Sequence, residues 1–149
     1  MKYLDDFTIG QSIQLGTTTV TKQDVLEFAS EFDPQPFHLD EEAGLASMLG
    51  GLAASGWHSC ALTMRLMCDA LFLKGEPLGS PGVEKLRWMA PVFPGDTLTG
   101  KLVVENVRKS NSKPDRGFVT LCANVEKSDG TKVLNMNCTV IYPVQGADR

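Results

Sequence analysis

Two side chains capable of acid–base chemistry lie five positions apart in the proline-containing segment Asp33-Pro34-Gln35-Pro36-Phe37-His38. On a strand this separation would place Asp33 and His38 on opposite faces, and on a helix about 140° apart. A turn shaped by two prolines can instead bring both side chains to one point, and it loses little entropy on ordering. A carboxylate beside an imidazole, whose ordinary pKa is about 6.5, suits a reaction in which one group takes a proton while the other gives one. The alternative is structural: Asp33 caps a turn and His38 packs at a helix boundary.

A second candidate for chemistry is the start of an apolar helix in the stretch Ala53-Ala54-Ser55-Gly56-Trp57-His58. Ser55 is a suitable N-cap, and the backbone N–H groups of Gly56 and Trp57 would then have no intrahelical acceptor. Glycine lets a ligand atom approach the backbone closely. Free donors at a helix start can stabilise a developing negative charge such as an enolate oxygen. An ordinary capped helix fits the same residues.

The two rings after this glycine are less informative. Trp57 either packs in the core or lines a ligand pocket, and its type alone does not decide between them. His58 is interpreted as a core histidine with satisfied hydrogen bonds rather than as an active group.

The flanking pattern indicates which elements position these residues. Thr21 and Asp24 predict a capped helix that ends near Phe32, because Pro34 disfavours helical geometry at Asp33. Residues 33–39 are then expected to be extended or turned. Asp40 can cap a short helix from 41 to about 48.

The rest of the chain predicts one long helix and several strands. Residues 56 to about 73 are apolar on almost every face, which is typical of a helix buried all round and about 27 Å long. Strands are expected at 12–20, 83–89, 98–107, 118–126 and 132–142, with turns at Pro94-Gly95-Asp96 and Ser128-Asp129-Gly130. This is an α+β layout, and a curved antiparallel sheet wrapped around the helix, a hot-dog arrangement, would bury it.

Size and charge exclude several classes of function. The 149 residues fit one domain, and a net charge of −4 argues against non-specific nucleic-acid binding. Four cysteines without a C-x-x-C pair and only two histidines argue against a disulfide framework and a metal site. Acidic residues at 5 and 6 argue against a secretory signal, and Arg65 and Asp69 interrupt the longest apolar stretch. We expect a cytoplasmic protein without a membrane span.

The stretch from Phe28 to Asp40 resembles the motif of the MaoC-like dehydratases, which include the R-specific enoyl-CoA hydratases: aromatic-x-x-x-x-Asp-x-Asn-Pro-x-His-x-Asp. Asp33, Pro36, His38 and Asp40 fall into register, and Gln35 stands in place of Asn. Residues 53–65 resemble the family's central helix, with Ser55-Gly56 where His-Gly is common. Residues 86–98 resemble its strand and Pro-Gly-Asp turn, so the likeness extends from about residue 3 to 142.

This resemblance implies a single hot-dog domain over residues 1–149 that forms a homodimer or a dimer of dimers. It implies a site at the dimer interface for an acyl-CoA or acyl-carrier thioester, without any further cofactor. The reaction would convert enoyl-CoA to 3-hydroxyacyl-CoA, with a family tendency to the R product. Asp33 and His38 would activate water for attack at Cβ and deliver a proton at Cα. Gly56 N–H would polarise the thioester carbonyl, with Ser55 and Trp57 beside it.

Two other functions stay open at this point. A hot-dog thioesterase would hydrolyse the same kind of ligand, but it usually carries a carboxylate on the central helix, where Asp69 is the only acid. A non-catalytic acyl-thioester-binding protein would keep Asp33 and His38 for packing. The phosphates of CoA need basic contacts, for which Arg87, Arg108 and Lys109 are candidates, although solvated surface charge fits these residues as well.

Overall fold

The computed structural model describes residues 1–146, so the last three residues of the predicted domain, 147–149, lie outside it. Its helical elements are η1 (Leu4–Asp6), α1 (Lys22–Phe32), α2 (Pro36–Leu39), α3 (Glu41–Ala46), α4 (Gly56–Ala70) and η2 (Phe72–Lys74). Its strands are β1 (Ser12–Gln14), β2 (Thr18–Thr19), β3 (Gly79–Trp88), β4 (Thr97–Lys109), β5 (Arg116–Lys127) and β6 (Lys132–Pro143).

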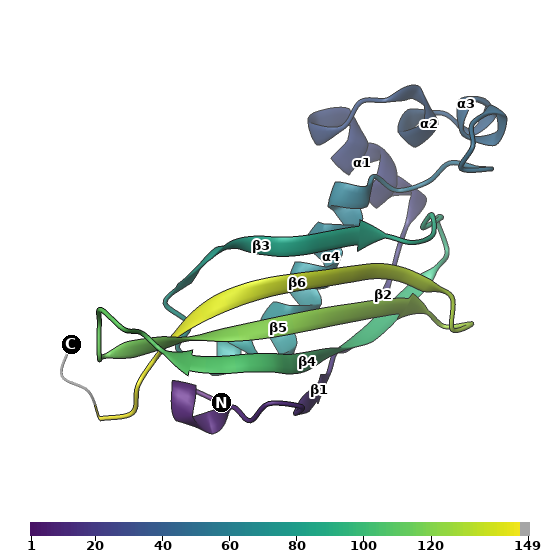
Figure 1. Cartoon of the computed structure of the whole chain (residues 1–149). Coiled ribbons are helices and arrows are strands. Elements are labelled where there is room, and N and C mark those ends of the chain that lie inside the picture. The colour runs from purple at the N-terminus through teal and green to yellow at the C-terminus, as the bar shows by residue number, and fades with distance from the viewer. Residues whose placement is uncertain (147–149) are drawn as a thin grey trace.

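The strands form one antiparallel sheet in the order β1-β4-β5-β6-β3, with β2 also paired to β4. Helix α4 lies along one face of this sheet, while α1, α2 and α3 gather beyond one end of it (Figure 1). The predicted α+β layout with a sheet packed on a long helix is therefore confirmed.

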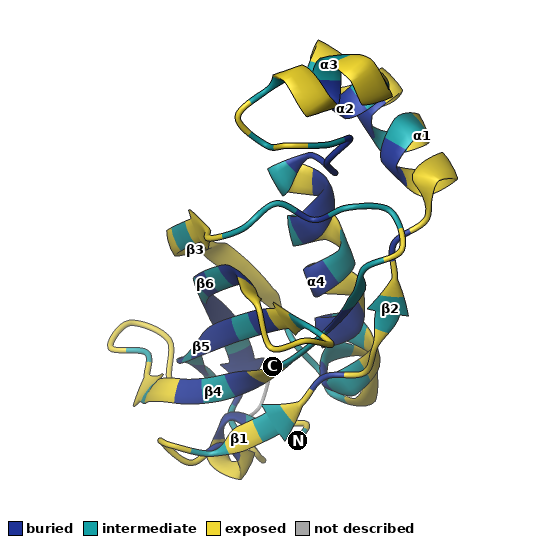
Figure 2. Cartoon of the chain, turned by 90° about the vertical axis from the view of Figure 1, so that its right-hand side faces the viewer, coloured by how far each residue is buried: buried dark blue, intermediate teal, exposed yellow. Residues whose placement is uncertain are grey.

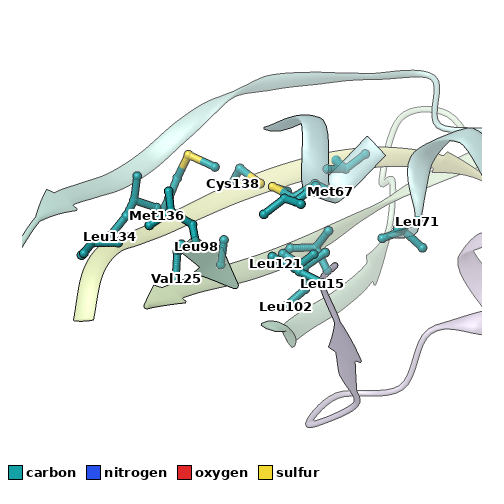
Figure 3. Close-up of a cluster of buried hydrophobic side chains, with 14 of the residues drawn as sticks. Leu15, Met67, Leu71, Leu98, Leu102, Leu121, Val125, Leu134, Met136 and Cys138 are labelled. Atoms are coloured by element: carbon teal, nitrogen blue, oxygen red, sulfur yellow. The ribbon is translucent and has the colours of Figure 1, made fainter. Parts of the chain in front are cut away.

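The core lies between α4 and the inward face of the three long strands. Leu102, Leu121 and Leu134 are fully buried in one cluster with Met67 of α4 and its C-cap residue Leu71. Figure 3 shows Leu102 and Leu121 beneath Met67, with Leu134 farther along the sheet. Burying each such side chain contributes about 1.5–3 kcal/mol, so this contact fixes the helix against the sheet.

The local signals for turns and caps act as expected. The Thr21 hydroxyl accepts the Asp24 N–H at 3.1 Å at the start of α1, and the Asp40 carboxylate accepts the Ala43 N–H at 2.8 Å at the start of α3. Asp96 N–H donates to the Phe93 carbonyl at 3.0 Å, with Gly95 at φ 93° between them. This is the glycine position of a type II turn.

The prediction of one strand over 12–20 is wrong, because β1 and β2 are separated at Leu15–Thr17. Leu15 is buried, and its N–H still donates to the Gly100 carbonyl at 2.9 Å. Its burial continues the alternation of β1, in which Ser12 and Gln14 are exposed. The break follows at residues 16–17, where the pairing with β4 shifts by one residue between Gln14–Lys101 and Thr18–Leu98.

Residues 33–39 were expected to be extended or turned, and in their second half Pro36–Leu39 forms one turn of helix. Proline at the first helical position already has the required φ, and it has no N–H to leave unsatisfied. Pro34 therefore ends α1 as predicted, while the second proline, Pro36, starts the next helical turn.

Helix α4 is not buried all round within one chain. Trp57 is 59% exposed and Met64 is 42% exposed, on the side of the helix that faces β3 and solvent. Figure 2 shows this exposure along the helix beside its buried face. The expectation of a fully buried helix fails here, since the sheet of a single chain covers only part of it.

Within residues 1–146, no helix combines the length and the apolar character that a membrane span requires.

Candidate active site

The end of α1 and the single turn of α2 bring the two acid–base side chains together. Asp33 caps α1, with its N–H on the Ala29 carbonyl at 3.0 Å, and the chain then turns so that the Gln35 N–H reaches the Asp33 carbonyl at 2.8 Å. The helical turn α2 follows directly and brings the His38 side chain back towards Asp33. The His38 Nε2 lies 3.4 Å from Asp33 Oδ2, so the predicted meeting of carboxylate and imidazole is present.

The backbone fixes the orientation of the imidazole. His38 is buried, and its Nδ1 lies 2.7 Å from the Ala53 carbonyl oxygen. A carbonyl can only accept, so Nδ1 carries the proton and Nε2 is the nitrogen that faces Asp33. In the neutral ring Nε2 is an acceptor, so a group with two protons to donate can lie beside the pair and bond to both Nε2 and the carboxylate.

Two donors hold the Asp33 carboxylate. The Ser55 hydroxyl donates to Oδ2 at 2.6 Å, and the Gln35 side-chain amide donates to Oδ1 at 2.7 Å. The Ser55 hydrogen bond is the largest cause that lowers the pKa of Asp33 below its ordinary value; burial opposes it, and the Gln35 hydrogen bond and the nearby His38 add smaller lowering effects. Asp33 is therefore a carboxylate at neutral pH.

Ser55 acts differently from the supporting role beside the carbonyl that was expected of it. It is fully buried, caps α4 by accepting the Trp57 N–H at 3.2 Å, and uses its own proton for Asp33. The N–H of Trp57 is thus not free. The N–H of Gly56 has no partner among the hydrogen bonds of the described residues, so it is the donor left at the helix start.

Trp88 of β3 holds this helix start against the sheet. Its indole N–H donates to the Gly56 carbonyl at 2.9 Å, and a Cβ at position 56 would lie only 2.6 Å from the ring. Glycine is required here because the indole occupies the space of a side chain. The sequence indicated room for a ligand at Gly56, whereas part of this room is taken by Trp88.

A pocket of about 320 Å³ opens beside these groups. Its walls are mainly apolar and come from α2, the loop before α4, the first turns of α4 and the end of β3: Phe37, His38, Leu49, Ala53, Ala54, Gly56, Ser59, Trp88, Met89, Ala90, Pro91 and Val92. It joins His38 to Gly56, while Asp33 stands behind His38, with its side chain 16% exposed. An acyl chain with its carbonyl at Gly56 would have its reacting carbons near His38.

Trp57 lies outside this pocket. Its ring stands edge-on to Trp88, with 5.2 Å between the ring centroids, on the exposed side of α4. Of the three residues predicted to bind substrate, Gly56 lines the pocket, Ser55 acts through Asp33, and Trp57 is placed elsewhere.

His58 is a buried histidine, as expected, but its hydrogen bonds are not all satisfied. Its ring stacks on Phe28 at 4.8 Å between centroids, and its Nδ1 has no partner. Burial lowers the pKa of His58, against a smaller opposing effect of Asp24. The ring is therefore neutral and sits between α1 and α4, outside the pocket.

The basic residues considered for CoA binding are not gathered at this pocket. Arg87 pairs with Asn135 on the face of β3 opposite to that of Trp88. The Arg108 guanidinium lies 4.1 Å above the Phe118 ring, and Lys109 ends β4, about 40 Å along the strand from Thr97. In Figure 1 that end of β4 lies far from α1–α3.

Other chemistries have less support from the geometry. The Asp69 carboxylate pairs with Arg65 at 3.0 Å and lies about 20 Å along α4 from Gly56, too far to act on the same thioester. Among residues 1–146, no group of three or more His, Cys, Asp or Glu side chains is placed to hold a metal ion.

Comparisons with known proteins show the family to which the chain belongs. Residues 6–126 match a family model described as MaoC like domain. The chain is 30% identical to YdeM, an uncharacterized protein of Bacillus subtilis (strain 168), over 138 residues that cover 93% of this chain and 96% of YdeM.

Solved structures confirm the predicted hot-dog fold. A MaoC-like dehydratase from Rhodospirillum rubrum superposes with a TM-score of 0.90 at 37% identity, covering 99% of this chain and 100% of that one. An (R)-hydratase from A. caviae involved in PHA biosynthesis gives a TM-score of 0.71 at 22% identity, covering 92% and 97% of the two chains, and so shares the fold. By its sequence and its structure, this chain belongs to the MaoC-like domain family.

Proposed function

We propose that the chain is a hydro-lyase that adds water to the double bond of an enoyl thioester, or removes it from the 3-hydroxyacyl thioester. The observation that carries the proposal is the 3.4 Å approach of His38 Nε2 and Asp33 Oδ2 beside a pocket that ends at the free N–H of Gly56. The (R)-hydratase among the structural relatives supports the same reaction class.

The two side chains suit a shared water molecule. Both His38 Nε2 and the Asp33 carboxylate are acceptors, so one water can donate a proton to each and direct its lone pair at Cβ. As the oxygen bonds to Cβ, one acceptor takes a proton and the electrons of the double bond move towards Cα and the carbonyl. A proton is then delivered to Cα, which restores the thioester.

The helix start supports the charged intermediate. When the electrons reach the carbonyl, the oxygen becomes an enolate, and the N–H of Gly56 at the start of α4 is placed to donate to it. Ser55 contributes indirectly, since its hydrogen bond holds Asp33 in the ionised form.

We also propose that two copies of the chain associate along β3 and the exposed side of α4. Strand β3 is the edge of the sheet, and Trp57, Met64, Val83 and Trp88 leave an exposed apolar face there, which we call the α4–β3 face. A second copy would pair the free edge and cover this face, which a monomer would expose to water. Because Trp88 also lines the pocket, the partner would close its open side.

A spectrophotometric assay tests the reaction. The protein is expected to remove the conjugated double-bond absorbance of crotonyl-CoA without releasing free thiol. Replacing one acceptor in Asp33→Asn or His38→Gln is expected to lower kcat by about 10²–10⁴-fold while the fold is retained. Asp69→Asn is the matched control, and it should leave the rate unchanged because its carboxylate is far from the pocket.

Two results would contradict the proposal. Free thiol appearing with the double bond intact would show a thioesterase. Binding without turnover, unchanged in Asp33→Asn and His38→Gln, would show a non-catalytic acyl-thioester-binding protein.

A further inference from the structure

We propose that the phosphates of a coenzyme A thioester lie in a lysine- and amide-lined hollow on the outer face of the sheet, adjoining the acyl pocket. This inference rests on the proposed function for the position of the thioester. It distinguishes coenzyme A from an acyl carrier protein, which carries the same pantetheine arm.

The hollow has a volume of about 540 Å³. Its walls include five side chains with N–H or O–H donors, Gln14, Thr99, Lys101, Asn124 and Lys132, together with one acid, Glu126. Phosphate oxygens accept hydrogen bonds and prefer cationic donors, so this lining fits the anionic end of coenzyme A better than it fits an apolar ligand.

The register of the sheet extends this lining towards Arg87. Lys101, Asn124, Asn135 and Arg87 are successive partners across β4, β5, β6 and β3. Four strands about 4.8 Å apart make this row about 14 Å wide, with a cation at each end. The row lies on the outer face because Lys101 is exposed, whereas its neighbour Leu102 is buried in the core.

The hollow and the acyl pocket meet at one residue. Met89 lines both of them, and its N–H donates to the Val133 carbonyl at 2.9 Å, which fixes it at the end of the sheet. An uncharged pantetheine arm leaving the pocket past Met89 would reach the hollow without crossing the core.

The negative charge of the helices α1–α3, on the other side of the acyl pocket, disfavours an acidic protein partner. Residues 23–64 contain no Lys or Arg, and they contain Asp24, Glu27, Glu31, Asp33, Asp40, Glu41 and Glu42. All seven acids lie in the segment 22–46 that contains α1–α3, where Lys22 is the basic residue and is paired with Glu41 at 2.9 Å. Figure 2 shows these three helices gathered at one end of the molecule. An acyl carrier protein is itself acidic and would meet like charge there. The small coenzyme can instead place its phosphates on the outer face of the sheet.

The test compares crotonyl-CoA with crotonyl-pantetheine, which lacks the nucleotide and its phosphates. In the Lys101→Ala/Lys132→Ala double variant, kcat/KM for the CoA ester is expected to fall about tenfold at low salt, with the pantetheine ester unchanged. Lys109→Ala/Lys113→Ala, at the far end of β4, is the matched control and should change neither substrate.

Binding separates this inference from the proposed function. The chain has two tryptophans, and their rings lie 5.2 Å apart next to the pocket, so their fluorescence can report binding of free CoA and of pantetheine without any turnover. If the protein hydrates neither ester, the proposed function fails, and the same tenfold loss of CoA affinity in the double variant still tests the hollow.

Two outcomes would overturn the inference. One is an equal effect of the double variant, or none, on the CoA and pantetheine compounds. The other is a crotonyl-carrier protein used with a higher kcat/KM than crotonyl-CoA.

Discussion

Asp33 is the residue whose ionisation is most directly set by named neighbours. Ser55 and Gln35 each donate to one of its oxygens, and His38 faces the same carboxylate. Each donor favours the charged form, so the carboxylate is ready to accept a proton from water.

Removing either donor should therefore shift the pH dependence of catalysis. Ser55→Ala and Gln35→Ala raise the pKa of Asp33, with the larger effect at Ser55, which is the stronger cause of its lowering. Because activity requires the ionised form, the acid limb of the kcat/KM profile moves to higher pH in both variants. Gln23→Ala, an exposed amide bonded only to Glu27, is the control, and an unmoved limb in Ser55→Ala would refute this role of the serine.

At the residue scale the sequence predicted that Asp33 and His38 meet, but not the contacts that orient them. Asp33 and His38 could be found because two prolines and their residue types signalled a fixed turn. The Ala53 carbonyl that orients His38 has no side-chain signature, and the sequence did not indicate that the Ser55 hydroxyl bonds to Asp33, because contacts between distant segments are set by packing.

The start of α4 and strand β3 are held together by the packing of the Trp88 indole on Gly56. Gly56→Ala places a methyl group 2.6 Å from the indole ring, which must move together with the helix start. We expect a loss of about 1–3 kcal/mol in the free energy of unfolding and a fall in kcat. In a Trp88→Ala background the same change should cost little stability, as urea unfolding of the four proteins would measure. An equal cost in both backgrounds would contradict this packing.

The packing of α1 on α4 should make stability depend on pH through His58. Its pKa is lowered by burial, with Asp24 of α1 the one charge found to oppose this. The unfolded chain takes up a proton below its ordinary pKa of about 6.5 while the folded chain resists, so the free energy of unfolding falls as pH drops through that range.

His58→Leu should flatten this dependence between pH 7.5 and 5.5, as chemical unfolding at several pH values would detect. The variant keeps an apolar contact with Phe28 and removes the unpartnered Nδ1. An unchanged slope would show that other groups determine the pH dependence.

At this scale the periodicity of the sequence predicted most elements and several of their caps, because each depends on neighbouring residues. The periodicity failed to predict the elements where tertiary contacts determine the local backbone structure. A one-residue shift in the pairing with β4 breaks the first strand after Leu15, and Pro36 ends a short extended stretch and starts a helical turn.

At the scale of the whole molecule, the two sides of α4 are apolar for different reasons. One side of the helix is covered by its own sheet, and the other contributes to the exposed α4–β3 face. The apolar pattern of the helix predicted burial all round but not what covers each side; the proposed second copy would cover the α4–β3 face.

A charge on the α4–β3 face should therefore prevent association. Met64→Glu is expected to convert the dimer into a monomer in size-exclusion chromatography with light scattering, because an unpaired carboxylate would be buried at the interface. Leu73→Glu, at another exposed leucine in η2, should leave the dimer intact. A wild-type monomer at micromolar concentration would refute the proposed association.

The most direct test of the proposed reaction is the fate of the water oxygen. Crotonyl-CoA incubated with the protein in H₂¹⁸O is predicted to give 3-hydroxybutyryl-CoA with the label on the C3 hydroxyl and the thioester intact. Label in a free carboxylate, or no label in any acyl product, would contradict a water molecule activated between Asp33 and His38.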